Sequence, residues 1–125
     1  GPVFDAELDT AVAAKTAGKS DDGLYCARCG HLVTRRRWAL APDGGHERIC
    51  ANPAGRMFTV VCFLEGPGAT DRGAPTEEFT WFTGHAWNFA HCRACADHLG
   101  WRYTSDLDPP LFWGLIKDRL SSLSK

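Results

Sequence analysis

The sequence lacks any apolar run close to the roughly 20 residues that a helix needs to cross a bilayer. It has no charged segment followed by an apolar stretch, the pattern of a secretory signal. Charge of one sign is lacking too, because 14 Lys and Arg residues stand against 15 Asp and Glu residues. That balance argues against partners attracted by bulk charge, such as nucleic acid or an anionic membrane. We therefore expect a cytoplasmic monomer that binds neither nucleic acid nor membranes.

The length of 125 residues and the hydrophobic share of 44% suit one packed domain. Gly1-Pro2 has the form of a scar left by tag cleavage. Residues 1–22 are small and polar, and we predict a flexible leader there, followed by a folded domain over 23–125. The alternative for the leader is a short helix with one apolar side, made by Val3, Phe4, Leu8 and Val12.

The pattern of the folded part favours strands, which predicts an all-β domain. The run Met57 to Leu64 is β-branched and aromatic and is bounded by glycines. We predict a loop over Gly66 to Pro75. The segment Leu111 to Leu120 is compatible with a strand that runs into a short helix, but its periodicity does not decide between strand and helix. Further short strands are predicted over His46 to Ala51, Ala86 to His91 and Leu99 to Tyr103.

Cysteine is abundant, and four of the six cysteines form two Cys-x-x-Cys pairs, Cys26/Cys29 and Cys92/Cys95, with 62 residues between them. A gap of two residues lets both thiolates of a tight turn point at one ion, so two pairs supply a closed tetrahedral site for structural Zn²⁺. Gly30 suits the left-handed backbone that often follows such a turn. Two disulfides would need an export signal, and a redox dithiol would need a βαβ context.

Cys50 and Cys62 remain outside these pairs, and each lies in an apolar, strand-like run. The simple interpretation is that each is a small buried side chain, and the alternative is a nucleophile. His91 and His98 flank the second pair and are candidates for a supporting contact to the metal.

Tryptophan is also abundant, and three of the five lie around the second cysteine pair: Trp81, Trp87 and Trp101. The metal would fix the segments that carry them relative to one another. Three indoles brought together form an apolar box that suits a small ring or a methylated ammonium group. The alternative is that all three are ordinary core residues.

One family combines these features in the same order. The run from Phe79 to Trp87, the segment from Cys92 to Tyr103 and the motif Phe112-Trp113-Gly114-Leu115 resemble the thalidomide-binding domain of cereblon, also called the CULT domain. Two upstream motifs match the same family, Cys26-x-x-Cys29-Gly30 and Asn52-Pro53-x-Gly55. The resemblance covers residues 24–120. Animal members have His at the positions of Ala54 and Phe79, so ligand contacts outside the bound ring are expected to differ.

The resemblance implies two antiparallel sheets that meet at an angle, a β-tent, pinned by the four-cysteine zinc site. It implies a pocket walled by Trp81, Trp87 and Trp101, with Tyr103 at its base. Asn52, on a loop that also carries Pro53, would hydrogen-bond the ligand. Backbone groups of Phe79 and Trp81 would pair with an imide.

The resemblance also implies a binding module and no enzyme. Its ligands would be glutarimide and related cyclic imide rings, as in thalidomide-type drugs, cyclic imides at protein C-termini and uracil-like rings. A domain of this kind that stands alone is similar to bacterial relatives, and ubiquitin ligase activity is not implied. The alternatives are a methyl-ammonium reader, a purely structural zinc module, and a methionine sulfoxide reductase of the B type. That enzyme has a nucleophilic Cys where Thr104 follows Arg102-Tyr103.

Overall fold

A computed structural model of the chain describes residues 21–123. The predicted leader lies outside this range except for Asp21 and Asp22. The Asp22 carboxylate accepts a hydrogen bond of 2.8 Å from Nε of Arg37, so this residue of the predicted leader contacts the folded domain. Within 21–123 the structure contains strands and three short 3₁₀ turns but no α-helix, which confirms the all-β prediction. None of its helical segments has the length and apolar character to span a membrane.

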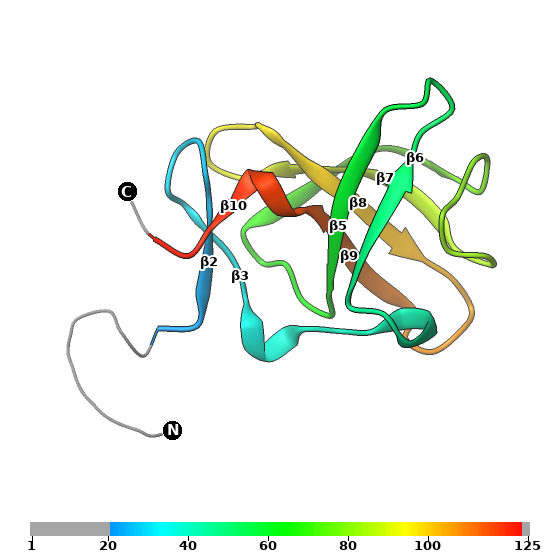
Figure 1. The fold of residues 1–125 in the computed structure, drawn as a ribbon, viewed down its shortest axis with the longest axis horizontal. Helices are drawn as coiled ribbons and strands as arrows, with labels where there is room; N and C mark the ends of the chain where they lie inside the picture. Colours follow the sequence, from blue (N-terminus) through cyan, green and yellow to red (C-terminus); the bar gives the residue numbers. More distant parts are fainter. Residues whose placement is uncertain (1–20, 124–125) are drawn as a thin grey trace.

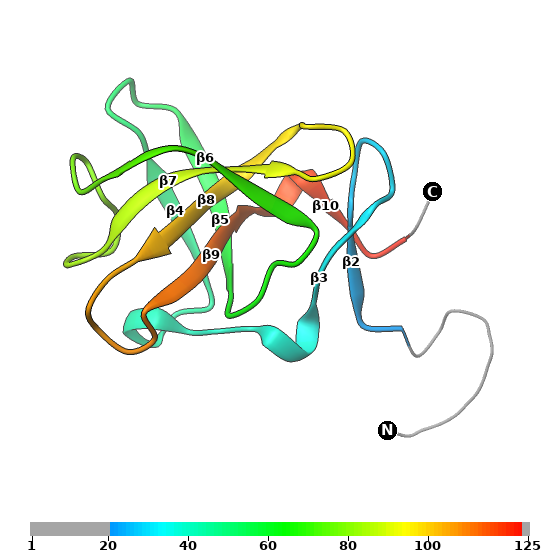
Figure 2. The same cartoon turned by 180° about the vertical axis from the view of Figure 1, so that it is seen from behind.

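The strands form two antiparallel sheets that lie side by side (Figures 1 and 2). The small sheet has the order β10-β2-β3 and lies at one end of the larger sheet, whose order is β4-β5-β9-β8-β7-β6. The bounds of the small sheet are β2 Gly23–Cys26, β3 Leu32–Arg35 and β10 Leu120–Ser121. Those of the large sheet are β4 Glu47–Ala51, β5 Met57–Phe63, β6 Ala69–Thr76, β7 Ala86–Cys92, β8 His98–Thr104 and β9 Leu111–Ile116. The 3₁₀ turns are Arg36–Trp38, Pro42–Gly44 and Lys117–Arg119.

The second half of β5 is buried on both faces of the large sheet, from Val60 to Phe63, which explains the apolar run there. Val61 and Phe63 belong to a core cluster that also contains Val33 of the small sheet, and this cluster joins the two sheets. Val60 and Cys62, which alternate with them, point into a second cluster on the other face. That second cluster includes aromatic residues of the pocket described below.

The prediction of a loop over Gly66 to Pro75 is wrong, because Ala69–Thr76 is strand β6. β6 pairs with β7 from Ala69 to Arg72, and the pairing resumes at Thr76 after a register shift. It is an edge strand whose middle is exposed, so it needs no apolar alternation. Gly73 has a φ of 86° and marks this irregularity rather than a loop.

The predictions for the other strands hold within a residue or two. His46 to Ala51 and Met57 to Leu64 correspond to β4 and β5, which pair with each other. Ala86 to His91 and Leu99 to Tyr103 correspond to β7 and β8. The segment Leu111 to Leu120, whose periodicity is ambiguous, contains strand β9 followed by the 3₁₀ turn Lys117–Arg119.

Candidate metal centre and aromatic pocket

The structure brings the four cysteines of the two pairs together. Their sulfurs all lie within 4.8 Å of one another. The Sγ atoms of Cys26 and Cys95 are 3.7 Å apart, and those of Cys29 and Cys92 are 3.6 Å apart. Thiolates about 2.3 Å from a tetrahedral ion have sulfurs about 3.8 Å apart, so the donor set fits a metal ion of this kind. A disulfide needs about 2.05 Å, and within 21–123 none is formed.

The two Cys-x-x-Cys turns have the same backbone hydrogen bonds. In the first, the N–H of Gly30 donates to the carbonyl of Cys26, and the N–H of Cys26 donates to that of His31, both at 2.8 Å. In the second, Ala96 N–H donates to Cys92 O at 2.8 Å in the same way. Gly30 has a φ of 82°, as predicted, and Ala96 occupies the corresponding position with a φ of 67°. The second turn therefore places an alanine where the first has glycine.

The thiols differ in their surroundings. Burial raises the pKa of Cys92 to about 12 and also raises the pKa of Cys26. The backbone N–H of His31 lowers the pKa of the exposed Cys29. A bound dication deprotonates thiols that burial keeps protonated, so metal binding at this site releases protons.

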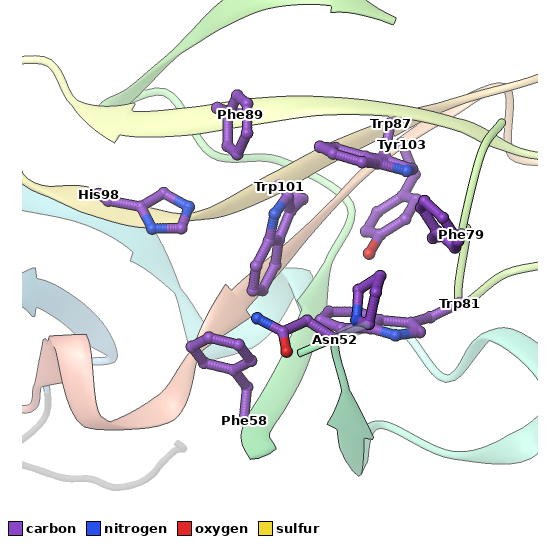
Figure 3. A pocket seen from close by; sticks show the side chains of 10 residues that line it. Asn52, Phe58, Phe79, Trp81, Trp87, Phe89, His98, Trp101 and Tyr103 are labelled. Atoms are coloured by element: carbon purple, nitrogen blue, oxygen red, sulfur yellow. The ribbon is translucent and has the colours of Figure 1, made fainter. Parts of the chain in front are cut away.

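A second feature of the fold is an aromatic cavity of about 370 Å³ (Figure 3). This volume is at the lower end of the range for small-molecule pockets, roughly 300–1,000 Å³. All seven residues predicted from the sequence line it, and Phe58, Phe89 and His98 complete the wall. The predicted seven are Asn52, Pro53, Phe79, Trp81, Trp87, Trp101 and Tyr103.

Pairing between β7 and β8 places most of the wall on one face of the sheet. Trp87 lies opposite Tyr103, and Phe89 lies opposite Trp101. Because side chains alternate along a strand, Trp87 and Phe89 share a face, as do Trp101 and Tyr103. The Trp101 ring meets the Trp81 ring edge to face, with centroids 4.8 Å apart.

His98 reaches the same face through a bulge. Ala90 pairs with Gly100, but His91 pairs with His98, so Leu99 is the extra residue. The imidazole centroid lies 5.3 Å from the Trp101 ring. Nε2–H of His98 donates to the carbonyl of Gly100 at 2.9 Å, which leaves the lone pair on Nδ1. Burial lowers the pKa of His98 below its usual range, so the ring is neutral at pH 7.

Two indole N–H groups tie the loops at the pocket to its walls. Trp81 donates through Nε1 to the carbonyl of Ala51 at 2.8 Å, where β4 ends. Trp87 donates to the carbonyl of Glu78 at the same distance. Trp81 is thereby joined to the end of β4, and Trp87 to the segment between β6 and β7.

The first of these loops is the turn between β4 and β5. Asn52 closes it, since Oδ1 accepts from the N–H groups of Ala54 at 3.1 Å and Arg56 at 2.9 Å. Gly55 has a φ of 86° in this turn. Because both bonds go to Oδ1, the Nδ2 group of Asn52 remains as a donor beside the cavity.

The second loop, between β6 and β7, carries Phe79. Phe79 has a φ of 59°, a conformation that aromatic residues rarely adopt, and its side chain is 63% exposed. Among residues 21–123, the backbone N–H and C=O groups of Phe79 and Trp81 have no hydrogen-bond partner. The loop therefore offers two donors and two acceptors at the edge of an apolar cavity.

Tyr103 forms the floor of the cavity. Its ring stacks on Phe112 at 5.1 Å, and its hydroxyl points toward Trp81 (Figure 3). Burial raises the pKa of the phenol well above its usual range, so it stays neutral. Cys50 and Cys62 are buried and do not line the cavity, and burial raises the pKa of Cys50. Neither has the surroundings of a nucleophilic thiolate, which disfavours the reductase alternative.

The sequence did not identify three of the residues that line the cavity, Phe58, Phe89 and His98. Phe58 and Phe89 had a usable signal, because each lies on a predicted strand at the right alternation, Phe89 two residues after Trp87. No feature of the sequence marks His98 as a cavity residue, because its position depends on the bulge in β8.

Comparison with known proteins agrees with this site. No family model matches the chain. Cereblon of Gallus gallus is 36% identical over 102 residues, and that of Xenopus tropicalis 38% over 102 residues. Cereblon of Drosophila willistoni is 46% identical over 108 residues. Each alignment covers 78% of this chain but only 17–23% of the relative, so the chain spans less than a quarter of those proteins.

The fold and the site define a class of protein: an all-β domain that has a cluster of four cysteines from two Cys-x-x-Cys turns and an aromatic cavity. The relatives compared above are all cereblon proteins. The chain carries a cereblon-like domain, the CULT domain, as the resemblance indicated.

Proposed function

We propose that this domain is a binding module that holds the ring of a cyclic imide, such as glutarimide or uracil, in its aromatic cavity. The ligands would include thalidomide-type drugs and proteins with a cyclic imide at the C-terminus. The proposal has no catalytic step. It depends chiefly on one observation, the unpaired backbone groups of Phe79 and Trp81 at the edge of the cavity.

An imide has a C=O, N–H, C=O edge, which needs one acceptor flanked by donors when it is buried. The backbone of Phe79 and Trp81 offers both kinds of group within one loop. The Nδ2 group of Asn52 adds a donor from the opposite loop. Since Oδ1 of Asn52 is already used within its turn, Asn52 would donate to a ligand carbonyl and would not accept from the imide N–H.

The remaining surface of such a ring is aliphatic or flat and apolar. Trp81, Trp87 and Trp101 supply matching walls, and their indole N–H bonds and edge contacts hold them in place before a ligand arrives. A preorganised wall loses little entropy on binding. Small rings should therefore bind although they make few polar contacts.

For the metal we propose Zn²⁺, because four thiolates in a closed tetrahedral arrangement are typical of structural zinc. Such a site has no open position, so the ion stabilises the fold and takes no part in binding. We also propose that the domain is monomeric and acts in the cytoplasm.

The methyl-ammonium alternative has weaker support. A reader of that kind needs carboxylates at the cage, and Glu77 and Glu78 precede Phe79 without lining the cavity. The polar groups at the cavity edge are paired donors and acceptors, which match a neutral imide better than a cation.

The test is a titration of the metal-loaded protein with glutarimide, followed by tryptophan fluorescence. We expect saturable quenching in the micromolar range. N-methylglutarimide is the matched control, because it keeps the ring and replaces the N–H donor by a methyl group, and it should bind at least tenfold more weakly. Trimethyl-lysine and methionine sulfoxide peptides serve as comparators. A response to either comparator without a response to glutarimide would reject the proposal.

A further inference from the structure

Asn88 is a buried amide on the face of the large sheet opposite the aromatic cavity. Its neighbours on β7, Trp87 and Phe89, line the cavity, so the alternation of the strand points Asn88 away from it. Asn88 is only 2% exposed, and an amide buried without hydrogen-bond partners is costly. The partners of Asn88 lie on the two strands beside it.

These partners join three neighbouring strands, β6, β7 and β8, which lie side by side in Figure 2. On β6, Nδ2 of Asn88 donates to Oδ2 of Asp71 at 2.9 Å and to the carbonyl of Gly73 at 3.1 Å. On β8, Nε of Arg102 donates to Oδ1 of Asn88 at 3.3 Å. Nη2 of Arg102 lies 3.3 Å from Oδ2 of Asp71, which closes a ring of three polar side chains. Both N–H groups and the oxygen of the amide are therefore used.

Asn88 lies opposite the irregular part of β6. Between the last two backbone pairs of β6 with β7, three residues of β6, Gly73 to Pro75, face Asn88 alone. Gly73 has a φ of 86°, and Pro75 has no N–H, so this stretch cannot continue a regular ladder. The bond from the Asn88 side chain to the Gly73 carbonyl holds this bulge against β7.

The bulge leads into the loop that carries Phe79. Thr76 follows the bulge and pairs with Trp87, and its Oγ1 accepts from the N–H of Glu78 at 3.1 Å. The carbonyl of Glu78 accepts from Nε1 of Trp87 at 2.8 Å. The loop is thus anchored one residue before Phe79, at the pairing that resumes after the bulge. A shift of the bulge would move the backbone groups of Phe79 relative to the cavity.

We propose that Asn88 is a positioning residue for imide recognition. By holding the bulge of β6, it fixes the Phe79 loop at the cavity and makes the domain selective for rings with a free imide N–H. This inference rests on the proposed function, since the backbone of Phe79 and Trp81 must bind the imide. Trp81 is also held by the Ala51 carbonyl and the Trp101 ring, neither of which belongs to β6 or its loop. Loss of Asn88 should therefore weaken polar recognition more than contact with the indole walls.

The test measures the N–H preference of the metal-loaded protein, defined as the Kd for N-methylglutarimide divided by the Kd for glutarimide. Asn88→Leu keeps a side chain of similar size and removes the hydrogen bonds of the amide. We expect the preference to fall from at least tenfold to about threefold or less. Amide hydrogen exchange across residues 77–82 should also be faster in the unliganded variant than in the wild type.

Thr34→Val is the matched control for a loss of stability. Thr34 is fully buried in the small sheet, outside the cavity wall, and its Oγ1 donates to the carbonyl of Glu65 at 2.6 Å. Valine has nearly the same shape without the hydroxyl, so this variant also loses a buried bond from a side chain to the backbone. It should lower the thermal unfolding midpoint and keep both the N–H preference and the exchange rates across residues 77–82.

Asp71→Ala gives a second variant in case Asn88→Leu does not fold. Asp71 is exposed, and its loss removes one acceptor of the Asn88 amide, so the N–H preference should fall at least about twofold. A preference that is unchanged in the folded variants of Asn88 and Asp71, or that Thr34→Val lowers equally, would overturn the positioning role alone. Absence of glutarimide binding by the wild type would overturn it together with the proposed function.

Discussion

Replacing Trp101 by alanine tests whether the aromatic cavity is the binding site. Trp101 is 7% exposed and is central to the wall. Its ring has edge contacts with Trp81 at 4.8 Å, Phe58 at 5.3 Å and His98 at 5.3 Å. A ligand in the cavity would lose one complete wall. Truncation of a central aromatic contact costs about 2–4 kcal/mol of binding free energy, so we expect glutarimide affinity to fall roughly 30- to 1,000-fold.

The same substitution also destabilises the fold, and the experiment must separate the two effects. Removal of a buried tryptophan costs about 3–5 kcal/mol, against a total stability of about 5–15 kcal/mol for a small domain. Metal content and the thermal unfolding midpoint should therefore be measured on the same sample. The metal should stay bound, because no cysteine ligand is altered.

Trp113→Ala is the matched control. Trp113 is half-buried on β9 and packs against the core cluster that joins the two sheets, away from the cavity. Its loss should lower stability but leave glutarimide affinity within a factor of about two, since no cavity wall is lost. If folded, metal-loaded Trp101→Ala bound glutarimide as tightly as the wild type, the ligand would have to bind elsewhere.

Three other predictions follow from single features of the structure. Gly30→Ala should destabilise the domain by about 1 kcal/mol, whereas Ala96→Gly should be neutral or stabilise it by up to that amount, because both positions have positive φ. Denaturant unfolding measures both free energies, and a loss of stability in both variants would contradict this expectation. Chelation of the metal should unfold the domain, since structural zinc contributes on the order of 10 kcal/mol to the stability of small domains. Circular dichroism would follow the unfolding, and an unchanged spectrum after complete metal removal would refute a structural role. Saturating glutarimide should slow amide hydrogen exchange across residues 51–56, because Asn52 gains a partner there; unchanged exchange would argue against contact with this loop.

The sequence alone determined the metal centre and the strands that carry most of the pocket. The spacing within each Cys-x-x-Cys pair is local, so it constrains both thiolates wherever the turn lies in the fold. Trp101 and Tyr103 alternate on one strand, so the period of two already placed their side chains on one face. The family resemblance supplied Asn52 and the Phe79 loop, which no periodicity marks.

Only the tertiary structure decided three other features. β6 is a strand because β7 offers it a partner, and an exposed edge strand carries no apolar pattern that a sequence could reveal. His98 joins the wall because a bulge adds Leu99 and reverses the face, and register shifts arise from pairing between strands. Arg56 lies over the Phe58 ring, and an exposed arginine has no local preference that would predict such a contact.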